Sequence, residues 1–217
     1  MGGKVAIITG GSRGIGKAVV EKFAGAGIKV YFTYANSEDS AAKLAEKCGA
    51  TAIRCPQNDS EKIAETVDKI YAENGTIDIL VNNAGITRDN FLMLMPKASW
   101  REVIETNLDG AYEWTKCVAK KMYARKSGSI IFISSVSGLV GVAGQTNYAA
   151  SKGAICAFSR ACAAELGAKS IRVNTICPGF IDTDMTAKIP RDIANALENR
   201  RKLPRPRFFW RRTGRRT

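Results

Sequence analysis

The sequence predicts an α/β fold in which a doubly wound parallel sheet lies between two layers of helices. Short β-branched runs alternate with amphipathic helical stretches along most of the chain. Strands that alternate with helices form right-handed crossovers, which give a parallel sheet covered on both faces. A length of 217 residues, with 45% hydrophobic residues, suits one such domain with a sizeable core.

The predicted elements alternate regularly along the chain. In order, we expect strand 4–9, helix 14–25, strand 28–34, helix 38–47, strand 51–54, helix 60–73, strand 77–81, helix 99–123, strand 129–133, helix 147–166 and strand 171–177. Ser60 is a typical N-cap residue and is expected to open helix 60–73. Active sites in such sheets lie beyond the carboxyl ends of the strands, so the segments that follow strands are the first candidates.

The cysteines and the lack of histidine limit the chemistry. The six cysteines show no CxxC pairing and the chain has no histidine, which excludes a Cys/His zinc site. We expect the cysteines to be buried, reduced thiols. The sequence shows no signal peptide and no apolar run long enough to span a bilayer, so we expect a cytoplasmic location and no membrane partner.

A glycine-rich turn joins the first strand to the first helix, with the sequence Thr9-Gly10-Gly11-Ser12-Arg13-Gly14-Ile15-Gly16. Glycine permits a tight turn, close approach of the backbone to a pyrophosphate, and close packing of helix on strand. The helix N-terminus then offers N–H groups and positive potential to the phosphates. The turn predicts a Rossmann-like dinucleotide site, with a merely structural turn as the alternative, because its spacing is Gly-x-x-x-Gly-x-Gly.

Tyr148 and Lys152 are four residues apart and therefore project from the same face of the predicted helix 147–166. An ammonium beside a phenol favours the phenolate, so we expect the pKa of Tyr148 to fall below its ordinary value of about 10. A serine hydroxyl from the end of strand 129–133 would complete a site that polarises a carbonyl. The alternative is a solvated helix face, on which this spacing is common.

Together these features resemble the short-chain dehydrogenase/reductase family in its shorter form. In chain order they are the turn 9–16, Asn82-Asn83-Ala84-Gly85, Asn107, Ser135, Tyr148-x-x-x-Lys152 and Pro178-Gly179. Within the family, segments 85–90, 144–148 and 178–185 look most like those of β-ketoacyl-(acyl-carrier-protein) reductases. The resemblance covers residues 4–200.

The resemblance implies a role for each catalytic residue. Tyr148 would be the general acid that protonates a carbonyl oxygen as hydride arrives from a nicotinamide. Lys152 would lower the pKa of Tyr148 and bind the nicotinamide ribose, and Ser135 would hold the substrate oxygen. Asn107 matches the position whose side chain bends its helix and holds a water of the proton relay, whereas Ser134 is expected to be structural.

The resemblance also implies the cofactor-binding residues. Asn83 would lie by the adenosine ribose, and Ile181 and Thr183 would meet the nicotinamide carboxamide. The full set is Gly10, Ser12, Arg13, Gly14, Ile15, Gly16, Asn83, Ala84, Gly85, Tyr148, Lys152, Pro178, Gly179, Ile181 and Thr183.

The end of the second strand favours NADPH over NAD. An NAD enzyme needs an acid there for the ribose 2′-hydroxyl, whereas this segment reads Tyr34-Ala35-Asn36-Ser37, and Arg13 lies in the phosphate turn. Pro56 stands where the family usually has an Asp or Asn near the adenine. Because proline lacks an N–H, Gln57 or Asp59 is expected to rebuild that contact.

The substrate implied is a 3-oxoacyl thioester on acyl carrier protein, reduced to the 3-hydroxyacyl thioester in fatty acid synthesis. Lys126 and Lys169 align with basic positions thought to dock the acidic carrier, the alternative being two solvated lysines. Acetoacetyl-CoA reductases and other ketone reductases share nearly all these motifs and remain alternatives.

The carboxyl end departs from the family. Residues 200–217 contain nine basic residues and no acidic one, and the 24 basic and 20 acidic residues before them carry only +4 of the total +13. We expect a dinucleotide-binding oxidoreductase domain over residues 1–199 and a poorly ordered basic tail over residues 200–217.

The tail has two interpretations. Residues 210–215 closely resemble Trp-Arg-Thr-Gly-Arg, which codons for the family's Gly-Glu-Pro-Glu-Glu can encode when they are read one base earlier. The first interpretation is therefore a frameshifted and truncated product without the seventh strand. The family is homotetrameric, so the expected result is a dimer or impaired assembly. The alternative is an inactive product whose basic tail, with Phe208, Phe209 and Trp210, is an arm that binds nucleic acid or a membrane surface.

Overall fold

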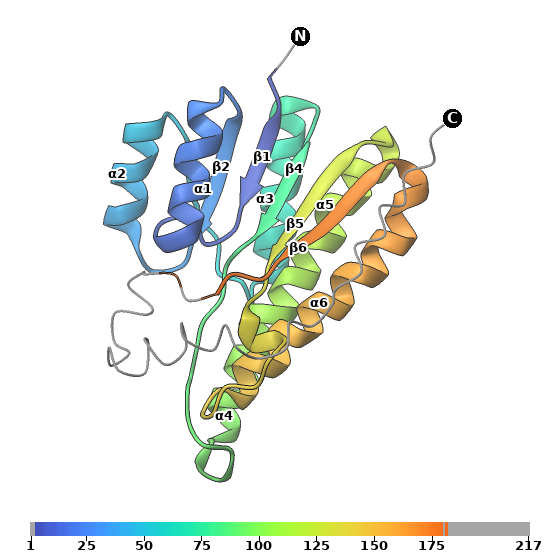
Figure 1. Cartoon of the computed structure of the whole chain (residues 1–217). Helices are drawn as coiled ribbons and strands as arrows, with labels where there is room; N and C mark the ends of the chain where they lie inside the picture. Colours follow the sequence, from blue (N-terminus) through green and yellow to red (C-terminus); the bar gives the residue numbers. More distant parts are fainter. Residues whose placement is uncertain (1–2, 180, 182–217) are drawn as a thin grey trace. The chain divides into compact units, whose positions relative to one another are not determined.

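The computed structural model describes residues 3–179 and 181, and these residues form a six-stranded parallel sheet with helices on both faces (Figure 1). The strand order is β3-β2-β1-β4-β5-β6. This confirms the predicted fold class. The strands are β1 (Val5–Ile8), β2 (Lys29–Tyr34), β3 (Thr51–Arg54), β4 (Ile79–Asn82), β5 (Gly128–Ile133) and β6 (Ile171–Ile176). The expectations for the seventh strand, the boundary at residue 199 and the basic tail lie outside the described residues.

The carboxyl ends of the strands are level with one another, which places the segments that follow them at one edge of the sheet. Ile8 of β1 pairs with Phe32 of β2, and with Val81 of β4 on its other side. Ile133 of β5 pairs with Ile176 of β6. The strand order reverses between β1 and β4, and ligands of such sheets bind in the crevice at that reversal.

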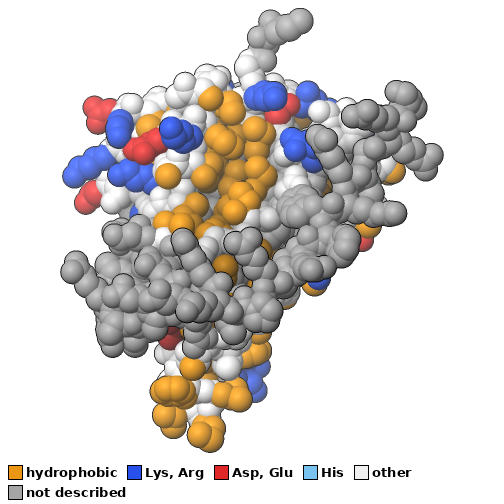
Figure 2. All heavy atoms as spheres, viewed as in Figure 1, with side chains coloured by type: hydrophobic (Ala, Val, Ile, Leu, Met, Phe, Trp, Pro, Cys, Tyr) orange, Lys and Arg blue, Asp and Glu red, His pale blue; other side chains and the backbone are white. Residues whose placement is uncertain are grey.

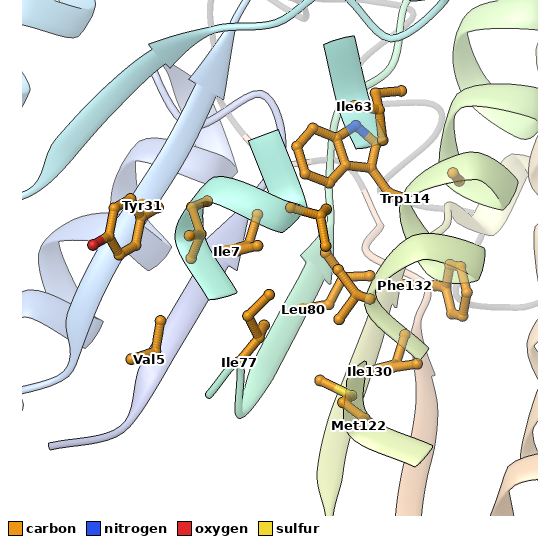
Figure 3. Packing of buried hydrophobic residues seen from close by; sticks show 14 of the residues in the cluster. Val5, Ile7, Tyr31, Ile63, Ile77, Leu80, Trp114, Met122, Ile130 and Phe132 are labelled. Atoms are coloured by element: carbon orange, nitrogen blue, oxygen red, sulfur yellow. The ribbon is translucent and has the colours of Figure 1, made fainter. Parts of the chain in front are cut away.

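The helices divide between the two faces of the sheet. Alternate residues of a strand point to opposite faces, so Ile7 packs in a cluster with α3 and α5, whereas Ile8 packs in a second cluster with α1 and α2. Figure 3 shows the first cluster, in which Trp114 of α5 lies beside Ile63 of α3. The helices are α1 (Gly14–Gly25), α2 (Glu38–Cys48), α3 (Ser60–Asn74), α4 (Lys97–Ile104), α5 (Gly110–Arg125) and α6 (Thr146–Leu166).

The long helix expected over residues 99–123 is interrupted by a π-helical segment. α4 leads into η2 (Glu105–Asp109), which is π-helical, and η2 leads into α5. Such π-turns insert an extra residue into a helix and are frequent at functional sites. Short 3₁₀ turns lie at η1 (Leu92–Leu94), η3 (Val136–Gly138) and η4 (Gly167–Lys169).

Two smaller expectations are corrected. Asp59, not Ser60, caps α3: its carboxylate accepts a hydrogen bond from the Lys62 N–H at 2.9 Å, and Ser60 is the first helical residue. All six cysteines are free thiols, but only half of them are buried. The buried ones are Cys55, Cys156 and Cys162.

None of the helices in the described part of the chain combines the length and apolar character needed to cross a membrane.

Candidate active site

The glycine turn is packed against the segment that follows β4. Gly10 has a φ of +64°, which favours glycine, and a Cβ there would lie 2.8 Å from the Ala84 Cα. A Cβ on Gly16 would collide with the Gly10 carbonyl and the Asn83 amide. The turn therefore has room for glycine alone at both positions.

Hydrogen bonds fix this contact in place. The Thr9 hydroxyl accepts from the N–H groups of Asn83 and Ala84, both at 3.0 Å. The Asn83 amide donates to the carbonyls of Thr9 at 2.9 Å and Gly10 at 3.0 Å. The side-chain amide of Asn83 thus holds the glycine turn itself, which is a positioning role that the sequence did not indicate.

The N-terminus of α1 directly follows the glycine turn. Arg13 occupies the N-cap position in an extended conformation and its side chain makes no capping hydrogen bond, so it does not satisfy the first N–H groups of the helix. Ser12 is buried and Ile15 packs into the core cluster beneath α1. This arrangement fits the pyrophosphate of a dinucleotide, because unsatisfied N–H groups and the helix dipole both favour an anion.

Ser135, Tyr148 and Lys152 meet beside the end of β5. Tyr148 lies in the first turn of α6 and Lys152 one turn later, with its Nζ 5.7 Å from the centre of the Tyr148 ring. The Lys152 ammonium is buried and donates to the Ile133 carbonyl at 2.8 Å. Ser135 directly follows Ser134 after β5, and its hydroxyl accepts from the Ser137 N–H at 3.1 Å.

Burial is the largest influence on the pKa values of Tyr148 and Lys152. It raises the pKa of Tyr148 above its ordinary value, a hydrogen bond with Ser135 opposes the rise, and the Asp89 carboxylate adds to it. The expected lowering of the Tyr148 pKa by Lys152 is therefore wrong, because desolvation of the phenolate outweighs the favourable contacts. Burial also lowers the pKa of Lys152 to about 8.

Asn107 lies in the π-helical segment and joins three parts of the site. Its Oδ1 accepts from the Ile86 N–H at 2.8 Å, and its Nδ2 donates to the Ile86 carbonyl and to the Ser151 hydroxyl, both at 3.0 Å. A Cβ on Gly85 would lie 3.1 Å from the Asn107 Oδ1 and 3.4 Å from the Lys152 Nζ. Residues 84–85 therefore touch the glycine turn on one side and the Asn107–Lys152 group on the other.

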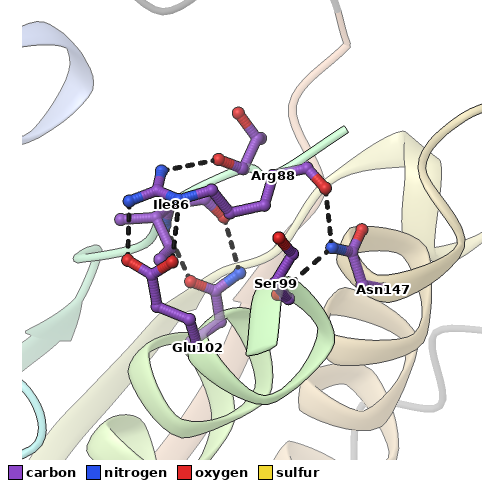
Figure 4. Close-up of polar contacts among 7 residues, drawn as sticks. Ile86, Arg88, Ser99, Glu102 and Asn147 are labelled. Carbon is purple, nitrogen blue, oxygen red and sulfur yellow. Dashed lines mark hydrogen bonds and ion pairs between the residues drawn. The ribbon is translucent and has the colours of Figure 1, made fainter. Parts of the chain in front are cut away.

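A network that the sequence did not indicate holds α6 in place (Figure 4). Asn147 is buried, donates to the Arg88 carbonyl at 2.8 Å, and accepts from the Tyr148 N–H at 2.7 Å. Arg88 forms an ion pair with Glu102 of α4 at 2.6 Å. The backbone at Tyr148 is thus tied to the loop after β4 and, through it, to α4.

The remaining predicted residues fall into three groups. Pro178 and Gly179 follow β6 at the same edge of the sheet, and the Pro178 carbonyl accepts from the Val136 N–H at 3.0 Å. Ile181 is described and exposed, whereas Thr183 lies outside the described residues. Ser134 is structural, as expected, since its buried hydroxyl donates to the Lys152 carbonyl at 2.8 Å.

The adenine contact expected from Gln57 or Asp59 is not supported. Gln57 turns into the core, where its Oε1 accepts from the Trp114 indole at 2.8 Å and its Nε2 is buried. Asp59 caps α3. The structure instead places an arginine that the sequence did not single out: the exposed Arg54 side chain donates to the Ala35 carbonyl at 3.3 Å, just after the end of β2.

An apolar surface lies near this site. η1 and the residue before it expose their hydrophobic side chains, with Met93 94% exposed (Figure 2). The segment is anchored to the loop before α6, because the Asn90 N–H donates to the Gly144 carbonyl at 2.8 Å. The exposed residues are Phe91, Leu92, Met93 and Leu94.

Comparisons with known proteins agree with this geometry. The family model described as short chain dehydrogenase matches residues 4–194. The 3-oxoacyl-(acyl-carrier-protein) reductase FabG of Escherichia coli (strain K12) is 45% identical over 192 residues, which span 88% of this chain and 78% of the relative. The protein of the same name from Chlamydia muridarum is 46% identical over 199 residues, covering 88% and 79%.

A solved structure shows the same architecture. The crystal structure of a short-chain dehydrogenase from Streptomyces avermitilis superimposes with a TM-score of 0.81 at 31% sequence identity. The match covers 85% of this chain and 68% of that chain.

Proposed function

The chain belongs to the short chain dehydrogenase family and is an oxidoreductase that acts on CH–OH groups, and we propose that it uses NADPH to reduce 3-oxoacyl thioesters of acyl carrier protein to 3-hydroxyacyl thioesters. The observation that carries the proposal is the meeting of the Tyr148 phenol, the Ser135 hydroxyl and the buried Lys152 ammonium beside a glycine turn that fits a dinucleotide.

The residues divide the work of carbonyl reduction. When bound, the cofactor supplies the hydride. Tyr148 donates its proton to the ketone oxygen as negative charge develops there, and Ser135 donates a hydrogen bond to the same oxygen. Burial keeps Tyr148 protonated at neutral pH, and the neighbouring Lys152 cation stabilises the phenolate that remains after the transfer.

Two cations support NADPH as the cofactor. Arg13 stands at the N-cap of α1, and the Arg54 side chain lies against the backbone at Ala35, where a ribose 2′-phosphate needs a positive charge. The segment 34–37 at the end of β2 carries no acid to repel that phosphate. Arg54 thus adds a second cation in support of NADPH, which the sequence favoured because of Arg13 and the lack of a carboxylate after β2.

Two surfaces support an acyl thioester as the substrate. The exposed apolar segment 91–94 suits an acyl chain, because a large exposed hydrophobic patch commonly marks a binding surface. Lys126 is the C-cap residue of α5, and the Lys169 ammonium lies 4.7 Å from the centre of the ring of Tyr123, in the last turn of the same helix. Two cations so placed suit an acidic carrier protein.

The test is NADPH oxidation with acetoacetyl-CoA and with a 3-oxoacyl carrier protein. Tyr148→Phe keeps the buried ring but removes the proton donor, so kcat should fall by about a hundredfold or more. Tyr71→Phe on α3 is the matched control and should retain activity. Full activity in Tyr148→Phe, or no NADPH oxidation by the wild type with either thioester, would overturn the proposal.

A further inference from the structure

Two cysteines that are 21 residues apart in the sequence meet beside the candidate active site. The Sγ atoms of Cys156, in α6, and Cys177, directly after β6, lie 3.7 Å apart. Cys156 is buried and Cys177 is half-buried, so the pair can be reached from the Cys177 side. We propose that Cys156 and Cys177 form a reversible disulfide, made by exchange with small-molecule disulfides, and that its closure switches off the neighbouring site.

The two sulfur atoms already lie near the separation that a disulfide bond requires. A disulfide holds its sulfur atoms about 2.05 Å apart, so the two atoms must approach by about 1.7 Å from the 3.7 Å of the reduced form. One cysteine is anchored in a long helix and the other follows a strand. Closure must therefore be shared between side-chain rotation and a small shift of α6 against the end of β6.

Both thiols are connected to the residues that build the site. Cys156 follows Lys152 by one helical turn, and its Sγ–H donates to the Ser134 hydroxyl at 3.3 Å. Ser134 in turn donates to the Lys152 carbonyl at 2.8 Å, and its N–H donates to the Ile176 carbonyl at 2.8 Å. Closing the disulfide removes the hydrogen that Cys156 donates to Ser134 and pulls on both neighbours of that serine.

The second thiol borders the segment predicted to meet the nicotinamide. Cys177 directly precedes Pro178, whose carbonyl accepts from Val136 at 3.0 Å. A shift of about 1 Å at such a site can cost about a hundredfold in rate, so the proposed activity should be sensitive to closure.

The exchange balances without any further reagent. One protein thiolate attacks a sulfur of oxidised glutathione, forming a mixed disulfide and releasing one glutathione thiolate. The second protein thiolate then attacks the protein sulfur of that mixed disulfide, forming the Cys156–Cys177 bond and releasing the second glutathione thiolate. The protein loses two electrons and two thiol protons, and glutathione disulfide gains them as two thiols.

The surroundings of Cys177 determine how fast its thiol exchanges with oxidised glutathione. Burial, with repulsion from Cys156 adding to it, raises the pKa of Cys177 to about 11. Because the thiolate is the nucleophile, closure should be slow at neutral pH and should accelerate about tenfold per pH unit as the pH rises towards that value.

The chemical test maps the bond directly. The protein is incubated with oxidised glutathione, quenched in acid, alkylated and analysed by peptide mass spectrometry. A peptide pair linked through Cys156 and Cys177, released by dithiothreitol, is the expected result, with Cys48→Ser as a control that still closes. Alkylation of both thiols, or glutathione retained on Cys177 without closure, would overturn the proposal.

The functional test uses the proposed reductase assay and is the only part that rests on the proposed function. Oxidation should lower NADPH turnover by about tenfold or more, with recovery in dithiothreitol, whereas Cys177→Ala should stay active and insensitive. A mapped disulfide with unchanged turnover would refute the switch. If the reduced protein is inactive from the start, the proposed function fails while the mapped bond is judged on its own.

Discussion

At the scale of single residues, burial decides the charge of the candidate catalytic pair. It raises the pKa of Tyr148 and lowers that of Lys152 to about 8. Both groups therefore hold their protons at neutral pH, which is the state from which a proton donor must start. Within the described residues, the buried ammonium donates to the Ile133 carbonyl and lies 5.7 Å from the centre of the Tyr148 ring.

This burial predicts a pH-dependent stability. The folded pKa of Lys152, about 8, lies below its ordinary 10.5, so the unfolded chain binds more protons between these values and stability rises with pH across this window. At about 1.36 kcal/mol per pH unit the gain is roughly 3 kcal/mol. Lys152→Met keeps the length of the side chain and removes the titration.

Urea unfolding of both proteins at a series of pH values measures this effect. The wild type should gain stability relative to Lys152→Met as the pH rises from about 8 to about 10.5. Lys43→Met, on the exposed face of α2, should follow the wild type. Parallel curves for the wild type and Lys152→Met would contradict the prediction.

The sequence predicted those side-chain arrangements that depend on neighbours within one helical turn, and it did not predict those that depend on distant segments. The spacing of Tyr148 and Lys152 lies within one helical turn, so the sequence predicted their common face. The pKa of Tyr148 depends on burial, which raises it, on the Ser135 hydrogen bond, which lowers it, and on Asp89, which raises it, and both of these residues belong to other segments. For the same reason the sequence could not indicate that Arg54 lies against Ala35, since that contact crosses from β3 to β2.

At the scale of elements, α1 shows which glycines a dinucleotide turn requires. A Cβ on Gly16 would collide with the Gly10 carbonyl, whereas a Cβ on Gly25 in the same helix would meet nothing within 4 Å. Gly16→Ala should push the turn open and weaken NADPH binding by about tenfold or more, because the turn brings the backbone close to the pyrophosphate.

Gly25→Ala supplies the matched control. It should bind NADPH normally and gain up to about 1 kcal/mol of stability, since alanine is the better helix former. Fluorescence titration with NADPH and urea unfolding measure the two effects. Equal NADPH affinity in both variants would show that the turn does not carry the cofactor.

Element bounds set by local sequence were predicted well, and those set by tertiary contacts were not. α1 and β3 begin and end at the expected residues, because glycines and a β-branched run mark them locally. The π-helical segment was missed. This segment contains Asn107, which hydrogen-bonds to Ile86 and Ser151. Both partners lie in other parts of the chain, so the local helical pattern of the sequence could not indicate the π-helical turn.

At the scale of the whole described fold, the parallel sheet brings distant segments to one edge. The parallel pairing of the strands agrees with the crossovers that the sequence predicted, so the fold class and the edge that carries the candidate site were predictable together, whereas the strand order was not predicted. Ala84 touches Gly10 and Gly85 approaches Lys152, so a cofactor held at the turn would be linked to the catalytic group through two consecutive residues.

A ligand that binds at the carboxyl ends of the strands should raise the free energy of unfolding of the whole domain. At a concentration of about 100 Kd, a ligand adds about 2.7 kcal/mol, which raises the Tm of a domain of this size by roughly 5–10 °C. If Arg13 and Arg54 bind the 2′-phosphate as proposed, NADPH should produce this shift and NADH a clearly smaller one.

Arg54→Ala tests the origin of that preference by thermal unfolding with each cofactor at equal concentration. It should reduce the extra shift that NADPH gives over NADH and leave the Tm of the free protein nearly unchanged, since the Arg54 side chain is exposed and its bond to the Ala35 carbonyl lies at the surface. Arg160→Ala, exposed on α6, is the control and should keep the preference. If NADH stabilises the wild type as strongly as NADPH does, the two arginines do not select the phosphate, and the assignment of NADPH fails independently of any measurement of catalysis.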